Sequence, residues 1–310
     1  MNLADERLKE LDNPSLTERE RAFLRCQTAA ELIHRGQYEA ASEALGELWR
    51  GIGQRPNVDG LDERAAAEVL HQVGALSGWM GASRQVQGAQ DASKDLLSES
   101  AALFERAGET AKAAFARSDL ALCYWREGAY DEARILLTRA SGELAGADAE
   151  RRAIVLLRWV TVECAAARLH DALSILKESG HILSGSENNP LLGSFHNLYA
   201  VTLRRLGAVE GGGDYYDQAI IEYTAAIYHY ELARHERYTA RIENNLAFLL
   251  YKLGRYADAH EHLDRAQSIF TRLRDEGSSA QVDETRARVL IAEKHYREAG
   301  RLIAGAIQTL

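Results

Sequence analysis

The stretch Leu253–Phe270, LGRYADAHEHLDRAQSIF, decides the fold, because its larger apolar and alanine residues recur at the period of an α-helix. Steps of three and four residues place five side chains on one stripe of such a helix. The five are Tyr256, Ala259, Leu263, Ala266 and Phe270. One face of this segment is therefore expected to be buried against a neighbouring helix.

The same stripe recurs along the chain and is each time preceded by a second apolar helix. Copies run through Tyr38, Ala41, Leu45 and Leu48; Tyr130, Ala133, Leu137, Ala140 and Leu144; Leu169, Ala172, Leu176, Ser179 and Leu183; Tyr216, Ala219, Tyr223, Ala226 and Tyr230; and Tyr296, Ala299, Ile303, Ala306 and Leu310. The preceding helix carries a small or slim residue. In five copies this residue stands nine positions before the residue that opens the stripe, as Ala247 does before Tyr256. The repeating unit is therefore a helical hairpin.

Seven such hairpins fill the chain. Their first helices are marked by Ala29, Gly74, Ala121, Val160, Ala200, Ala247 and Ala287, and the approximate units are 17–55, 61–108, 109–146, 149–184, 190–234, 236–275 and 280–310. A single hairpin exposes an apolar face that only a stacked neighbour can bury. Thr17 and Glu20 have the spacing of a capping box and predict the start of the first helix.

These residues resemble the tetratricopeptide repeat (TPR) family. Its Gly-x-Tyr step followed by alanine stands here as GQYEAA, GAYDEA and GRYADA, and as KHYREA without the glycine. The resemblance implies an all-α, right-handed α-solenoid of about seven TPR-like hairpins, forming one domain over residues 1–310. The period of about 40 residues exceeds the family's usual value of about 34, as in long-repeat members found in bacterial signalling and transcriptional regulators.

Composition agrees with an all-α protein. The chain has 310 residues, 46% of them hydrophobic, and only three prolines. A formal charge of −9 argues against nucleic acid or an anionic membrane as partner. MNLADERLKE does not read as a signal peptide and no apolar run is long enough to span a bilayer, so a cytoplasmic location is expected. Cys26, Cys123 and Cys164 are widely spaced and predict buried thiols.

No catalytic, metal or cofactor motif is recognised, and the protein is predicted not to be an enzyme. His260 and His262 are two residues apart, which directs them to different sides of a helix. The glycines in GAVEGGGDYYDQA, Gly207–Ala219, lack the lysine and hydroxyl of a phosphate-binding loop and are flanked by Glu210 and Asp214. We expect Gly207 to end a helix and the following residues to form an enlarged turn. A second enlarged turn is expected within GWMGASRQVQG, Gly78–Gly88.

In TPR arrays the first helix of each hairpin lines the concave face, which commonly holds peptides or partner helices. Carried over to this chain, the resemblance implies that this face presents Arg126, Arg158, Asn197, Arg204, Arg205, Arg241, Asn244, Asn245, Tyr251, Lys252 and Arg288. Asparagine amides can hold a peptide backbone, and six arginines with one lysine outnumber Asp119 and Glu284. This predicts an acidic peptide or a free carboxylate as ligand. For any single residue, a structural role in capping or ion pairing is an equal alternative.

Two functions remain open at this point. The first is a non-catalytic module that binds a protein or peptide in its groove. The alternative is the ligand-sensing region of a larger bacterial signalling or transcription-regulator protein, with an effector or DNA-binding domain beyond Leu310. Ile303, Ala306 and Leu310 form an apolar stripe without a capping helix, so either more chain follows or a homodimer covers this C-terminal helix.

Overall fold

The computed structural model describes residues 11, 15–34, 36–146 and 148–309 of the chain. It divides into two compact units, Met1–Ala166 and Ala167–Leu310. The predicted Leu310 position of the C-terminal stripe lies outside the described residues.

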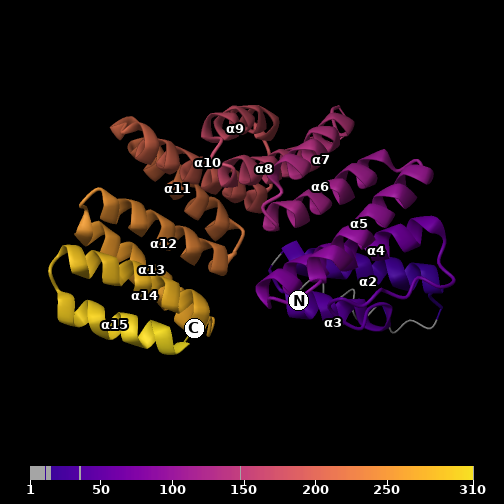
Figure 1. The fold of residues 1–310 in the computed structure, drawn as a ribbon, viewed down its shortest axis with the longest axis horizontal. Coiled ribbons are helices and arrows are strands. Elements are labelled where there is room, and N and C mark those ends of the chain that lie inside the picture. Colours follow the sequence, from indigo (N-terminus) through magenta and orange to yellow (C-terminus); the bar gives the residue numbers. More distant parts are fainter. Residues whose placement is uncertain (1–10, 12–14, 35, 147, 310) are drawn as a thin grey trace. The chain divides into compact units, whose positions relative to one another are not determined.

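The described residues form fourteen α-helices and one short 3-10 helix, η1 (Gly46–Leu48), drawn in Figure 1. Unit 1 holds α2 (Glu18–His34), α3 (Tyr38–Leu45), α4 (Glu63–Ser83), α5 (Ala89–Arg106), α6 (Thr110–Arg126), α7 (Tyr130–Glu143) and α8 (Ala149–Ala165). Unit 2 holds α9 (Leu169–Leu183), α10 (Asn189–Glu210), α11 (Gly213–Leu232), α12 (Glu236–Lys252), α13 (Tyr256–Arg272), α14 (Glu276–Ala292) and α15 (Tyr296–Thr309). The all-α prediction is confirmed.

Consecutive helices pack as hairpins in sequence order. In unit 1 the pairs are α2 with α3, α4 with α5 and α6 with α7, and α8 packs on α6 and α7. In unit 2, α9 packs on α10, and the pairs are α10 with α11, α12 with α13 and α14 with α15. We call α2, α4, α6, α8, α10, α12 and α14 first helices, and their hairpin partners second helices.

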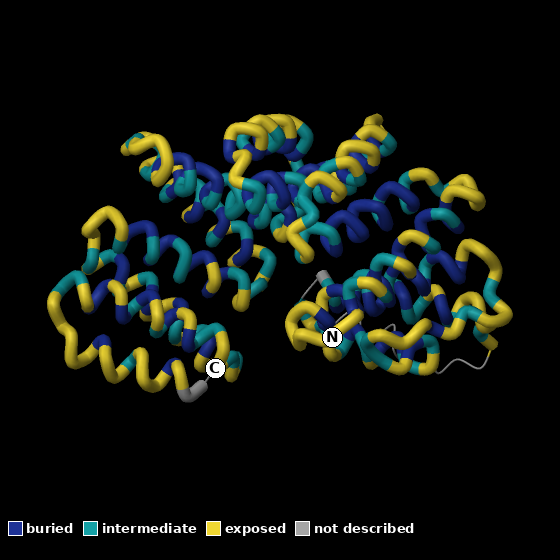
Figure 2. The backbone as a smooth tube through the Cα atoms, viewed as in Figure 1, coloured by how far each residue is buried: buried dark blue, intermediate teal, exposed yellow. Residues whose placement is uncertain are grey.

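The predicted stripe is the buried face of the second helices. On α13, Ala259, Leu263, Ala266 and Phe270 are at most 1% exposed. Figure 2 shows buried and exposed positions alternating along the helices. The tyrosines that open these helices are less buried than expected, and their burial differs between hairpins. Tyr256 is half-buried, whereas Tyr296 at the start of α15 is 63% exposed. The alanines and the larger apolar side chains, rather than the tyrosines, therefore form the most buried part of the stripe.

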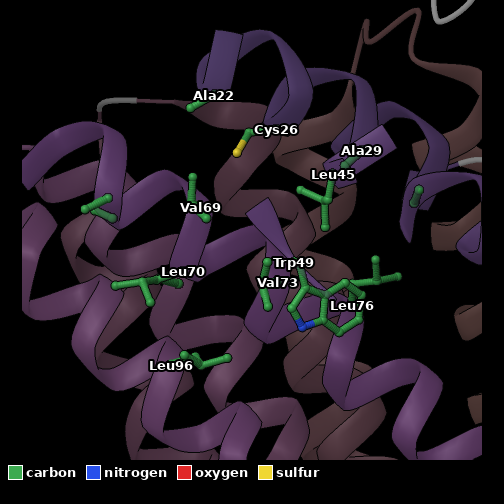
Figure 3. Packing of buried hydrophobic residues seen from close by; sticks show 14 of the residues in the cluster. Ala22, Cys26, Ala29, Leu45, Trp49, Val69, Leu70, Val73, Leu76 and Leu96 are labelled. Carbon is green, nitrogen blue, oxygen red and sulfur yellow. The ribbon is translucent and has the colours of Figure 1, made fainter. Parts of the chain in front are cut away.

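The core of unit 1 illustrates how small and large side chains interlock. Leu45 of α3 and Leu70 and Leu76 of α4 are fully buried and belong to one cluster with the small side chains of Cys26 and Ala29 on α2 (Figure 3). The three cysteine side chains are buried, as the sequence predicts. Burial raises the pKa of the Cys26 thiol, which keeps it protonated and unreactive.

Helix starts follow the expected chemistry. The Thr17 hydroxyl accepts a hydrogen bond from the Glu20 amide at 3.2 Å, and the Glu20 carboxylate accepts one from the Thr17 amide at 2.9 Å. This reciprocal pair is the predicted capping box. Gly254 closes the α12–α13 turn in a left-handed conformation, and Lys294 adopts the same conformation where KHYREA lacks the glycine.

The prediction of an enlarged turn at Gly207–Ala219 is wrong. Gly207 lies inside α10, which continues to Glu210, and only Gly211 and Gly212 separate it from α11. A Cβ atom on Gly207 would lie 2.8 Å from the Tyr216 ring, so the glycine permits close packing of the hairpin. The extra residues therefore lengthen both helices. The other expected insertion lengthens α4 and leaves a five-residue turn, 84–88.

Candidate functional site

All eleven predicted binding residues lie on first helices. Arg126 of α6 and Arg158 of α8 belong to unit 1. The other nine belong to unit 2, on α10, α12 and α14.

In unit 2, three cations from three helices surround one aromatic ring. The centre of the Phe248 ring on α12 lies 5.5 Å from the Arg204 guanidinium of α10 and 5.6 Å from that of Arg288 on α14. The ammonium of Lys252 lies 5.6 Å from the same ring. Such cation–π contacts are attractive by about 0.5–1 kcal/mol each at exposed sites. We call Phe248, Arg204, Lys252 and Arg288 the Phe248 cluster.

The charge of the Phe248 cluster is only partly compensated. Arg288 forms an ion pair with Glu284 one turn earlier on α14, at 2.5 Å. Within the part of the chain that the structure describes, neither Arg204 nor Lys252 has an ion pair with a carboxylate. Arg204 instead lies close to the hydroxyl of the buried Tyr223, whose pKa is raised by burial despite this cation. The cluster therefore has positive charge available for an anionic group.

Two equivalent asparagines of α10 and α12 have buried amide oxygens. The Oδ1 atoms of Asn197 and Asn244, 47 residues apart in the repeat, are inaccessible to solvent and make no hydrogen bond to any described residue. Leaving a polar atom buried and unpaired costs about 1–3 kcal/mol. Buried polar atoms without a partner are rare in proteins, and a functional role is one explanation for them.

The remaining residues of α10 and α12 complete an aromatic and basic surface. Arg241 lies 5.7 Å above the Tyr238 ring, and Tyr251 lies 6.0 Å from Phe248. Arg205 on α10 and Asn245 on α12 are half-buried. Phe248 itself was not among the predicted residues, because in the sequence it reads as one more apolar residue of NNLAFLLYK.

In unit 1, Arg158 belongs to a buried polar network. Its Nη2 atom lies 2.8 Å from Oδ1 of Asp119, its Nη1 atom donates to the Ser118 hydroxyl, and the guanidinium lies 4.5 Å above the Phe115 ring. His71 contacts the other oxygen of Asp119. Burial acts to raise the pKa of Asp119, but Arg158, His71 and Arg126 outweigh it and hold that pKa below its usual value. These contacts give Arg158 a structural role.

Arg126 is held differently. Its guanidinium lies 4.5 Å above the Trp79 ring, and Trp79 is in turn stacked on Tyr38 at 5.8 Å. Burial lowers the pKa of Arg126, and its Nη2 atom has no hydrogen-bond partner among the described residues. Trp79 is 39% exposed, so it serves as a platform for this arginine as well as a packing residue.

A pocket in unit 1 escaped the sequence analysis. It has a volume of about 370 Å³ and lies at the amino-terminal ends of α2, α4 and α6. Its lining is Arg19, Glu20, Phe23, Arg64, Ala65, Glu68 and Lys112. Phe23 is 43% exposed, and the Lys112 ammonium lies 5.9 Å from its ring. Charged residues from three separate helices give no local sequence motif, which is why this pocket was missed.

The histidines considered as metal ligands pair with different carboxylates. Nε2 of His260 lies 2.9 Å from Glu293, whereas His262 contacts Glu243. Among the described residues, no group of three or more histidine, cysteine or acidic side chains is arranged to hold a metal ion. Within the same part of the chain, no helix is both long and apolar enough to cross a bilayer.

No family profile matches the sequence, and a search of curated proteins finds no significant match. Solved structures do match the fold. A Rap protein complexed with competence and sporulation factor aligns with a TM-score of 0.65 at 11% identity, covering 99% of this chain and 90% of that one.

Two further structures are similar over most of their length. Aspartyl phosphate phosphatase F from Bacillus subtilis has a TM-score of 0.59 at 12% identity, covering 99% of this chain and 88% of that one. The apo form of the quorum sensor NprR from B. thuringiensis has a TM-score of 0.53 at 14% identity, covering 98% of this chain and 92% of that one. At these identities the similarity establishes the fold alone. The chain has the fold of the TPR-like helical repeat proteins.

Proposed function

We propose that this protein is a non-catalytic module that binds a peptide or protein segment along the first helices of unit 2, with an acidic side chain or a C-terminal carboxylate at the Phe248 cluster. The observation that carries the proposal is the convergence of Arg204, Lys252 and Arg288 on one half-buried ring. A carboxylate placed there would form charge-assisted hydrogen bonds with the cations.

The asparagines extend the proposed contact along the peptide. Each amide supplies a donor and an acceptor, as the backbone of an extended peptide requires. Asn197 and Asn244 are half-buried, and rotation of either side chain would turn its buried amide oxygen toward a bound peptide. The two lie on successive first helices, so one peptide would engage both.

The experiment is a selection from a library of short peptides with free C-termini, followed by titration calorimetry of the best binder. The Arg204→Gln/Lys252→Gln variant should bind at least about tenfold more weakly, because it removes two unpaired cations. Arg301→Gln is the matched control, since Arg301 is an exposed arginine of the second helix α15. Equal binding by the wild type and the double variant would contradict the proposal.

A second candidate function is a ligand-sensing regulatory region of a larger signalling or transcription-regulator protein. It is favoured by the similarity to NprR, a quorum sensor, and to the Rap complex with competence and sporulation factor. Peptide binding would then alter the packing of the hairpins. Hydrogen exchange should show protection that spreads beyond α10, α12 and α14 when the selected peptide binds. Protection confined to those helices would favour the simple binding module.

The absence of catalysis is part of the proposal and is tested separately. One similar structure is named an aspartyl phosphate phosphatase. The purified chain is assayed for hydrolysis of a phosphoaspartyl protein. Hydrolysis that is abolished by changing a single residue of the chain would show an enzymatic function instead of a binding function. The proposal predicts no turnover.

A homodimer through α15 is a further proposal about partners. Ile303 and Ile307 of α15 are 38% and 71% exposed, whereas Ala306 between them is buried. Sedimentation of the wild type and of Ile303→Glu/Ile307→Glu tests it. A dimer that becomes monomeric in the variant supports the proposal, and a wild-type monomer rules it out.

A further inference from the structure

Helix α11 is apolar on two opposite faces. Its buried face carries Ala219, Tyr223, Ala226 and Tyr230, which pack in the core of unit 2. On the opposite face Ile221, Tyr228 and Leu232 are 66%, 57% and 53% exposed, and Ala225 is half-buried. The spacing of these four residues, in steps of four, three and four, makes one continuous stripe. We call them the α11 outer stripe.

The repeat itself supplies a comparison that shows the stripe is not required by the fold. Tyr216 of α11 corresponds to Tyr256 of α13, 40 residues later. The four positions of the α11 outer stripe correspond on α13 to Glu261, Arg265, Ser268 and Arg272, all exposed. In α9, 47 residues before α11, the first three positions are Ser174, Glu178 and His181, also exposed. The positions equivalent to the α11 outer stripe are thus polar on α13 and α9.

The charges on α11 are all of one sign. Between Gly213 and Leu232 there are four acidic residues and no lysine or arginine. Glu222 pairs with His196 at 2.6 Å. Asp217 and Glu231 are exposed, lie beside the α11 outer stripe on the helix surface, and have no ion pair with any described residue. The stripe is therefore an apolar surface with uncompensated negative charge at its edge.

We propose that the α11 outer stripe is a docking surface for an amphipathic helix of a partner protein whose apolar face is flanked by lysine or arginine. The stripe extends over residues 221–232, about 16 Å at 1.5 Å per residue, which suits the three or four anchor residues of one docked helix. Basic flanks would pair with Asp217 and Glu231. A second copy of α11 would instead bring like charges together, so charge complementarity selects a basic partner.

This surface is on a second helix, whereas the peptide site of the proposed function is on first helices. Its existence does not depend on that function. A protein that bound a peptide at the Phe248 cluster could report the event through a partner docked on α11, because α10 and α11 form one hairpin.

The test uses two synthetic helical peptides of about 18 residues, roughly five helical turns. Both carry the same leucine stripe, flanked by lysine in one and by glutamate in the other. Fluorescence anisotropy measures their binding to the full chain. The lysine-flanked peptide should bind more tightly than the glutamate-flanked peptide. The Ile221→Gln/Tyr228→Gln variant should bind the lysine-flanked peptide at least about tenfold more weakly than the wild type, because two exposed apolar anchors are lost. Ser268→Gln, the α13 position equivalent to Tyr228, is the control and should bind as the wild type does.

A second variant separates charge from apolar contact. Asp217→Asn/Glu231→Gln leaves the α11 outer stripe unchanged. This variant should bind the lysine-flanked peptide more weakly, and the affinity should depend less on salt concentration. The proposal is overturned if both peptides bind equally, if the α11 variants bind as the wild type does, or if sedimentation shows that the wild type associates with itself through these residues. Circular dichroism confirms that each variant keeps its helices, so lost binding is not lost folding.

Discussion

His71 of α4 and Asp119 of α6 are joined by a buried contact of 2.9 Å between Nε2 and Oδ2. The other oxygen of the same carboxylate lies 2.8 Å from Nη2 of Arg158 on α8. One carboxylate thus connects three successive first helices of unit 1. A buried charge of this kind is tolerated only while its partners remain in place.

Asp119→Asn should therefore destabilise unit 1. The change leaves the half-buried Arg158 without its carboxylate, and breaking a buried ion pair costs about 3–5 kcal/mol. Urea denaturation followed by circular dichroism measures the loss. The double variant Asp119→Leu/Arg158→Met should recover part of it, since no unpaired charge remains. A single variant as stable as the wild type would show that the network contributes little.

The same carboxylate predicts a pH dependence. The folded-state pKa of Asp119 is below its usual value of about 3.9, so the group contributes stability above that value and loses it as pH falls through the folded-state pKa. The difference in unfolding free energy between the wild type and Asp119→Asn should therefore be constant near neutral pH and shrink below about pH 4. A difference that stays constant down to pH 2 would contradict this account of Asp119.

Gly207→Ala tests the packing of the α10–α11 hairpin. The new Cβ would lie 2.8 Å from the Tyr216 ring, and overpacking costs about 1–3 kcal/mol. Gly300→Ala in α15 is the control, because no atom lies within 4 Å of its Cβ position and helix propensity alone should stabilise it by about 0.5–1 kcal/mol. Thermal unfolding of the two variants should shift in opposite directions. A stabilised Gly207→Ala would mean that the hairpin is packed less closely.

Asn197→Ala and Asn244→Ala should raise stability while lowering peptide affinity. Each removes a buried oxygen that has no partner in the described structure, an arrangement that costs about 1–3 kcal/mol. Such opposed effects are typical of residues kept for function. Chemical denaturation and calorimetry with the selected peptide measure the two quantities on the same samples. Loss of stability without loss of affinity would assign the asparagines a structural role.

The repeat could be predicted from the sequence because its signal is periodic. The stripe from Tyr256 to Phe270 fixes the face of a helix, and its recurrence fixes the hairpins. Gly207 shows where this reasoning fails. A glycine near the end of an apolar run reads as a helix stop, but here the Tyr216 ring, nine residues later, packs on it and the helix continues. Such a contact cannot be recognised from local propensity.

The candidate site was predictable only in part. Position in the repeat assigned Arg204, Lys252 and Arg288 to first helices, which is where the structure has them. Their convergence on Phe248 depends on side-chain direction across three helices, which the spacing does not give. The buried pairing of Arg158 with Asp119 was hidden for the same reason.

The most direct test of the central claim is charge reversal at the Phe248 cluster. Calorimetry would compare the selected acidic peptide and a copy with lysine in place of its acidic residues, against the wild type and Arg204→Glu/Lys252→Glu. The account predicts that the variant binds the acidic peptide with an affinity lower by about 100-fold or more. It also predicts that the variant binds the lysine peptide more tightly than the wild type does. An acidic peptide that binds both proteins equally would contradict it.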